Sequence, residues 1–181
     1  MYRLDNLIEQ WAADFKLVSH NPEGGAAGKR FFRIDSISDL KPVILSLTKI
    51  KTPVVAFSTQ IEGSSNESGA GTYYLANIFI LVQQEQTTSP YREDLNAANA
   101  KYLAVEIAEK LKAWLMEKKK NEKLYPELKG LNLKSVGMAS FPKHFNNWWP
   151  LHIQMDYLNA DYVCVNPEDY NSSEAGEGVK S

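Results

Sequence analysis

The stretch of this chain that most constrains its fold is the run Thr72–Gln83 (TYYLANIFILVQ), which is apolar at nearly every position. Successive side chains of a β-strand point to opposite faces of its sheet, so a strand of this composition has to be covered on both faces. We therefore expect the central strand of a layered domain. A second strand is expected over 53–61, with one of its faces formed by Val55, Phe57, Thr59 and Ile61.

Two segments have the periodicity of amphipathic helices. Residues 2–18 place apolar side chains three and four positions apart, namely Leu4, Leu7, Ile8, Trp11 and Phe15. Residues 90–120 predict a long helix with Ser89 as its cap and Pro90 at its first position. Its apolar residues form a drifting stripe from Leu95 to Leu115, and 118–120 place lysines in the last turn, where positive charge suits the carbonyl end.

The remaining elements are shorter. A strand is expected over 29–35, a short helix capped by Ser36 and restricted by Pro42 over 36–47, and a closing pair of strands over 131–141 and 149–157. The residues from 20 to 28 are expected to form a loop. The order predicts an α+β fold (α-β-α-β-β-α-β-β), with a mostly antiparallel sheet flanked by an N-terminal helix and one long helix. Residues 1–165 form one domain in this interpretation, and 166–181 form a flexible acidic tail.

Composition excludes several functional classes. The chain has 20 Lys and Arg against 22 Asp and Glu, a net charge of −2, which argues against a dedicated nucleic-acid-binding protein. Its single cysteine, Cys164, cannot form an internal disulfide bond. We find no signal-peptide pattern and no apolar stretch approaching the roughly 20 residues that span a membrane. These features predict a protein that works, without membrane contact, in the compartment where it is made.

No motif predicts catalysis or metal binding. The segment 24–30 (GGAAGKR) has Glu23 where a phosphate-binding loop needs glycine, and Arg30 where it needs serine or threonine. The serines near 64–68 do not form a nucleophile elbow, and 69–71 leads into a strand, whereas a dinucleotide fingerprint opens a helix. His20, His144 and His152 show no metal-ligand spacing, and Cys164 sits in an apolar setting typical of an inert thiol. We expect no enzyme activity, no cofactor and no metal.

Two features indicate protein contacts instead. The segment 62–71 is a polar loop too long for a tight hairpin, and such loops often carry function. Trp148 and Trp149 are adjacent on a predicted strand, so only one of them can readily join the core, while the other is free to anchor a partner. The candidate partner-binding residues are Glu62, Ser64, Ser65, Asn66, Glu67, Trp148 and Trp149.

In length and layout the chain resembles the tail terminator (tail-completion) proteins of bacteriophages. The resemblance rests on an N-terminal helix, central strands joined by a long polar loop over 53–83, the long helix over 90–120, and a final strand pair ending in the aromatic-rich 148–157. It implies a non-catalytic virion protein that forms a homo-oligomeric, commonly hexameric, ring. Such a ring caps the tail tube and meets the head connector, so the resemblance implies these proteins as partners. It also implies virion assembly in the host cytoplasm and a final location in the virion tail.

Two other interpretations remain open from the sequence. One is a small ligand-binding domain or enzyme with a pocket between sheet and helices, for which Tyr73, Tyr74, Tyr102, His144 and His152 would be the polar lining. The other is a monomeric adaptor that binds one protein through Trp148 or Trp149. The association state of the chain separates these interpretations from a ring-forming protein.

Overall fold

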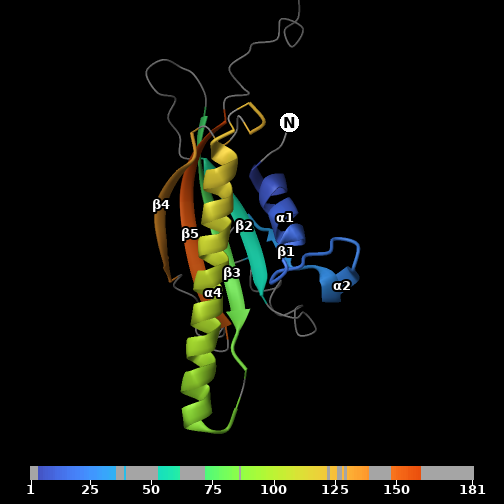
Figure 1. The fold of residues 1–181 in the computed structure, drawn as a ribbon, viewed down its shortest axis with the longest axis vertical. Coiled ribbons are helices and arrows are strands. Elements are labelled where there is room, and N and C mark those ends of the chain that lie inside the picture. The colour runs from blue at the N-terminus through green and yellow to red at the C-terminus, as the bar shows by residue number, and fades with distance from the viewer. Residues whose placement is uncertain are drawn as a thin grey trace, which may run out of the picture.

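The computed structural model describes residues 4–35, 39, 53–61, 72–85, 87–121, 123–125, 128, 130–138 and 148–159. These residues form an α+β fold in which α1 and α4 pack on one face of a five-stranded sheet (Figure 1). Its elements are α1 (Leu4–Asp14), α2 (Gly25–Gly28), β1 (Phe31–Arg33), β2 (Val54–Ile61), β3 (Thr72–Gln83), α4 (Pro90–Lys119), β4 (Asn132–Met138) and β5 (Trp148–Asn159). The predicted fold class is confirmed, and the strands follow one another along the chain in the predicted order.

The sheet has the strand order β1-β2-β3-β5-β4, with β3 in the centre. Only the β1–β2 pair is parallel, and the other three pairs are antiparallel. The register aligns Phe57 of β2 with Ile78 of β3, and Ile78 with Ile153 of β5. Because facing residues of paired strands share a face of the sheet, these side chains form one continuous apolar row beneath the helices.

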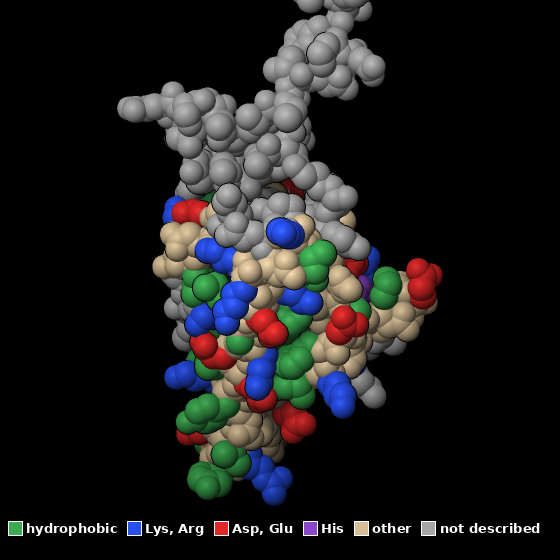
Figure 2. Space-filling model, turned by 45° about the horizontal axis from the view of Figure 1, so that its top comes forward, with side chains coloured by type: hydrophobic (Ala, Val, Ile, Leu, Met, Phe, Trp, Pro, Cys, Tyr) green, Lys and Arg blue, Asp and Glu red, His purple; other side chains and the backbone are tan. Residues whose placement is uncertain are grey.

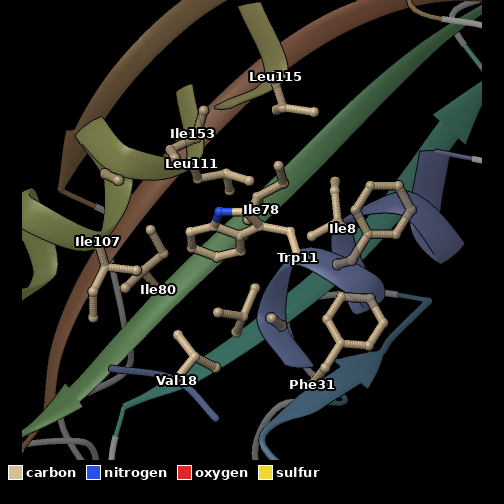
Figure 3. Packing of buried hydrophobic residues seen from close by; sticks show 14 of the residues in the cluster. Ile8, Trp11, Val18, Phe31, Ile78, Ile80, Ile107, Leu111, Leu115 and Ile153 are labelled. Carbon is tan, nitrogen blue, oxygen red and sulfur yellow. The ribbon is translucent and has the colours of Figure 1, made fainter. Parts of the chain in front are cut away.

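The main core lies between that face of the sheet and the two long helices. Trp11 of α1 is 4% exposed and lies next to the apolar residues of α4 and β3, including Ile107, Leu111 and Ile78 (Figure 3). Its indole also stacks on Phe15, with ring centroids 4.8 Å apart. The periodicity in 2–18 therefore predicted the buried side of α1 correctly, although the helix ends at Asp14.

The opposite face of the sheet is also buried at its centre. Phe79 is 1% exposed, and Leu81, Ala56 and Val54 are fully buried, although α1 and α4 both lie on the other side (Figure 1). The prediction that 72–83 form a strand covered on both faces is confirmed. Polar side chains share this second face: Ser58 and Asn77 are 4% and 6% exposed and face each other across β2 and β3.

Helix α4 is longer than the body it packs on. Its 30 residues span about 45 Å, and its first turns project beyond the sheet (Figure 1). None of its first ten residues is buried, and the first buried position is Ala100. At its other end, Lys118 lies over the rings of Trp114 and Tyr125, and Lys119 donates a hydrogen bond to the carbonyl of Leu131. The lysines of the last turn thus anchor the helix end through specific contacts.

Several local expectations need correction. The last four residues of the expected loop over 20–28 form the short helix α2, which Gly25 enters with a φ of 59°. Such a backbone conformation favours glycine, because it has no Cβ. Ser89 is the N-cap residue of α4, but its side chain makes no capping hydrogen bond. The helix expected over 36–47, the loop over 62–71 and the tail over 166–181 lie outside the described residues, except for Asp39 in a helical turn.

Candidate functional site

The densest polar cluster of the described residues joins α1 to β1. Arg33 donates from Nε to Asp5 Oδ2 at 2.7 Å, and from a terminal nitrogen to Glu9 Oε2 at 2.7 Å. The Asp5 side chain is 7% exposed, so its ion pair is largely removed from water. The bond from Arg33 lowers the pKa of Glu9, and the same bond raises the pKa of Arg33. This cluster links α1 to β1.

His20 extends the cluster into the interior. Its side chain is fully buried, and Nδ1 accepts hydrogen bonds from the backbone N–H groups of Arg30 at 3.0 Å and Phe31 at 3.3 Å. Since Nδ1 is an acceptor, the ring proton is on Nε2, which faces Glu9 Oε1 at 3.4 Å. Burial lowers the pKa of His20, and Glu9 partly opposes this shift. Because Nδ1 accepts from two backbone donors, this geometry fits the neutral ring.

This cluster contains the residue types of an acid–base site, but a substrate cannot reach its histidine. A general base has to reach the proton that it removes, and the His20 ring has no exposed surface. Each of its nitrogens already faces a protein group. The arrangement instead satisfies two backbone donors where the chain enters β1. The cluster therefore has a structural role. The sequence indicated nothing of it, because Glu9, His20 and Arg33 show no recognisable spacing.

A second histidine occupies the far face of the sheet. The ring of His152 stacks on Phe79 with centroids 4.7 Å apart, and Nε2 lies 2.8 Å from Asn77 Oδ1. Burial lowers its pKa. The ring is half-buried, although His152 alternates with apolar residues along its strand, because its cross-strand neighbour on the central strand β3 is the buried Phe79.

The expected pocket lining does not converge. Tyr102 is 72% exposed on α4. Tyr74 alternates with Asn77 and Phe79 along β3, so it belongs to the helix-covered face, whereas His152 belongs to the opposite face. The side chain of Tyr73 and all of His144 lie outside the described residues. The described members of that set thus occupy three separate surfaces.

The structure describes only the tryptophans among the predicted partner-binding residues. Trp149 packs against the core cluster beneath α4, and its Nε1 is buried without a hydrogen-bond partner in the described part of the chain. Trp148 is half-buried and pairs with Gln83 across the strands. The prediction that only one of the two joins the core agrees with these positions. Glu62, Ser64, Ser65, Asn66 and Glu67 lie outside the described residues.

The two most exposed large apolar side chains of the described residues, Tyr91 and Tyr102, lie on the outer side of α4. Tyr91 is 80% exposed, Tyr102 72% and Leu95 50%. With Ala98 and Val105 they follow a spacing of four, three, four and three residues, so they share one side of the helix over about four turns. Hydrophobic side chains are visible at this projecting end, among charged ones (Figure 2). We call Tyr91, Leu95, Ala98, Tyr102 and Val105 the outer stripe.

The outer stripe corrects the sequence interpretation of this helix. The apolar residues of 95–115 do not form one drifting stripe. The buried positions are Ala100, Ala104, Ile107, Ala108, Leu111 and Leu115, and with about 100° per residue they lie nearly opposite the outer stripe. The signal that could have separated the two stripes was present in the four–three spacing from Tyr91 to Val105, which differs in phase from the buried set.

The described residues were also compared with the requirements of a metal site and of a membrane-spanning helix. No group of three or more His, Cys, Asp or Glu side chains in the described part of the chain is placed to hold a metal ion. Among the same residues, no helix combines the length and the apolar character that crossing a membrane requires.

Comparison with known proteins adds no assignment to this geometry. The chain matches no model of a known protein family, and it matches no curated protein sequence. The functional interpretation therefore depends on the surfaces described above, among which the outer stripe contains the two most exposed large apolar side chains of the described residues.

Proposed function

We propose that this protein is a non-catalytic structural protein that acts by binding other protein subunits, and that the outer stripe of α4 is one of its assembly surfaces. The observation that carries the proposal is the exposure of Tyr91, Leu95 and Tyr102 in one row on a projecting helix. A row of exposed apolar side chains on one side of a helix is a typical feature of a protein-binding site, and tyrosine is enriched where binding energy concentrates.

The position of the outer stripe supports this function. The buried side of α4 already satisfies the packing of the domain, so the outer residues contribute little to its stability. Exposed apolar side chains on the outer side of a helix favour non-specific association unless a partner covers them. The net charge of −2 adds little repulsion between copies of the chain.

The kind of assembly that we propose is that of the bacteriophage tail terminators, which the chain resembles in layout. In this proposal identical subunits form a ring on the end of a tail tube, within the virion tail. A ring requires two unlike faces of the subunit that meet head to tail. The polar loop over 62–71 and the region of Trp148 are the proposed contacts with neighbouring subunits, tube proteins or the head connector.

Measurement of mass and particle shape tests this proposal. We expect light scattering over a range of protein concentrations to give masses above the 20.4 kDa of one chain, and electron microscopy to show closed particles. Tyr102→Asp should reduce the association, because it places a charge in the outer stripe. Leu124→Asp is the matched control, since Leu124 is 63% exposed but lies outside α4. A wild-type protein that stays monomeric at every concentration and forms no particles would refute the proposal.

A further inference from the structure

We infer that the outer stripe pairs with the outer stripe of a second copy of this chain, with the two α4 helices antiparallel over residues 91–102. This inference rests on the proposed function, since it names the partner of the proposed assembly surface. It commits to a two-fold contact between identical faces, in which each residue pair occurs twice.

The spacing of the stripe is that of a helix-pairing seam. Residues that recur alternately at three and four positions keep one side of a helix facing a partner helix, as in coiled coils. Tyr91, Leu95, Ala98, Tyr102 and Val105 follow this repeat without interruption. The next seam positions are Glu109 and Lys112, which are joined by an ion pair of 2.8 Å within the helix. The apolar seam therefore covers only the projecting half of α4.

The limited length of the seam selects the antiparallel direction. In a parallel pair, Glu109 would face Glu109 of the second copy, and Lys112 would face Lys112, both on the seam. In an antiparallel pair centred between Asn96 and Ala97, Glu109 lies about 9 Å beyond the first residue of the other helix. The antiparallel pair therefore uses the apolar positions and leaves the charged ones outside.

Side-chain size is also complementary in the antiparallel pair. Leu95 lies level with Ala98 of the second copy, so a large side chain meets a small one, and Tyr91 lies level with Tyr102 of the second copy. A parallel pair would instead place Ala98 on Ala98 and leave a gap in the seam. Alternation of large and small residues is what allows facing helices to interdigitate.

The charged residues beside the seam fit the same arrangement. Asp94 and Lys101 lie on the same edge of the outer stripe, and both are exposed. In the antiparallel pair Asp94 is offset by only about 3 Å along the axis from Lys101 of the second copy, within reach of a lysine side chain. Because the contact is two-fold, this attraction occurs twice. Arg92, on the other edge, lies near the neutral Asn99 of the second copy.

The shape of the subunit leaves room for this contact. The first turns of α4 project beyond the sheet, and the sheet packs on the side of the helix opposite the outer stripe (Figure 1). Two subunits joined along their outer stripes would therefore hold their sheets on opposite sides of the helix pair. Residues 90–99 contain no buried position whose packing the contact would disturb.

The area of the contact indicates a weak, concentration-dependent pair. An aromatic side chain buries about 150–250 Å², so the largely exposed Tyr91 and Tyr102 of two copies supply roughly 600 Å². Both copies of Leu95 and Ala98 add to this area, and the total stays below the ~1,000 Å² of a specific interface. A two-fold contact closes after two copies, so it is distinct from the head-to-tail contact of a ring and would join subunits of two rings.

Cysteine cross-linking tests the direction of pairing. In the full chain with Cys164→Ser, Tyr91→Cys and Tyr102→Cys are prepared as two separate variants with different affinity tags, then oxidised alone and as a mixture. We expect the mixture to give at least ~10-fold more cross-linked dimer, joining the two tags, than either variant alone, because the antiparallel pair brings position 91 to position 102. Efficient self-cross-linking of each variant would indicate a parallel pair and would overturn the inference.

Charge reversal gives a second test that does not depend on cysteine chemistry. Asp94→Lys should weaken the dimer about 10-fold in sedimentation, and adding Lys101→Asp should restore most of the loss, because the two positions attract each other only in the antiparallel pair. In a parallel pair the carboxylate introduced at position 101 would instead lie beside Glu106, so failure of the restoration overturns the inference.

If neither test gives dimers but the wild-type chain still forms closed particles, only this inference fails. If the chain is monomeric throughout, the proposed function fails with it.

Discussion

The buried His20 offers the sharpest test of how this fold is held together. Replacing His20 with alanine removes the acceptor of the Arg30 and Phe31 backbone N–H groups, which lie 3.0 and 3.3 Å from Nδ1. A buried donor left without a partner costs about 1–3 kcal/mol, and the lost ring volume adds to it. We expect His20→Ala to lower the free energy of unfolding by about 2–4 kcal/mol, or the midpoint temperature by roughly 5–15 °C.

Two further variants separate the acceptor from the bulk of the ring. Asparagine places Oδ1 where the histidine has Nδ1, so His20→Asn keeps an acceptor for both backbone donors. We expect it to cost about 1–2 kcal/mol, because only the contact with Glu9 and some volume are lost. Glutamine places its polar atoms one bond further out and should behave like alanine. Urea unfolding at pH 7.5 gives all three values, and a His20→Asn variant as unstable as His20→Ala would refute the reasoning.

The same geometry sets a pH dependence. Protonated His20 would present a donor at Nδ1 to two backbone donors, and burial lowers its pKa in the folded state. The unfolded chain then binds the proton more readily, so stability present above the ordinary value of about 6.5 is lost as pH falls below it. The loss can reach about 1.4 kcal/mol per pH unit. Comparing pH 7.5 with pH 5.5, we expect the wild-type protein to lose more stability than His20→Asn, and equal losses would contradict this account.

Other described features give narrower predictions. Arg33→Gln should lower stability by about 2–4 kcal/mol in urea unfolding, because it leaves the nearly buried carboxylate of Asp5 without its cation. The control Lys112→Gln breaks the exposed ion pair within α4 and should cost less than about 0.5 kcal/mol. Leu111→Ala should cost about 2–5 kcal/mol, since Leu111 is fully buried in the core, and a smaller loss would show that the helix repacks. NMR titration should place the midpoint of His152 below about 6.5, because its ring is half-buried against Phe79, and a midpoint above that value would show a solvated ring.

The sheet was predictable because its pattern is local. The period-two alternation in 53–61 and the double-sided apolar run in Thr72–Gln83 identify a neighbouring and a central strand before any partner is known. The buried side of α1 follows in the same way from the spacing of Leu4, Leu7, Ile8 and Trp11. Each of these patterns leaves little choice of side chains to bury, because Thr72–Gln83 is apolar on both faces and α1 is apolar on one side.

Helix α4 shows where such a pattern becomes ambiguous. Its sequence contains two apolar sides in different phase, and either could have faced the sheet. The tertiary structure buries the side that contains Ala100, Ala104 and Ala108, whose small side chains let the helix approach the strands closely. The bulkier tyrosines stay outside. The choice depends on the space between helix and sheet, which no local pattern contains.

The polar cluster of Asp5, Glu9, His20 and Arg33 depended on tertiary structure altogether. These residues come from α1, the turn after it and β1, and up to 28 positions separate them in the chain. Sequence by itself determined their types and the elements that carry them. Only the packing of α1 beside β1 decided that the His20 ring would lose its water, keep its proton on Nε2 and accept from two backbone groups, because burial and hydrogen-bond partners are properties of the assembled fold.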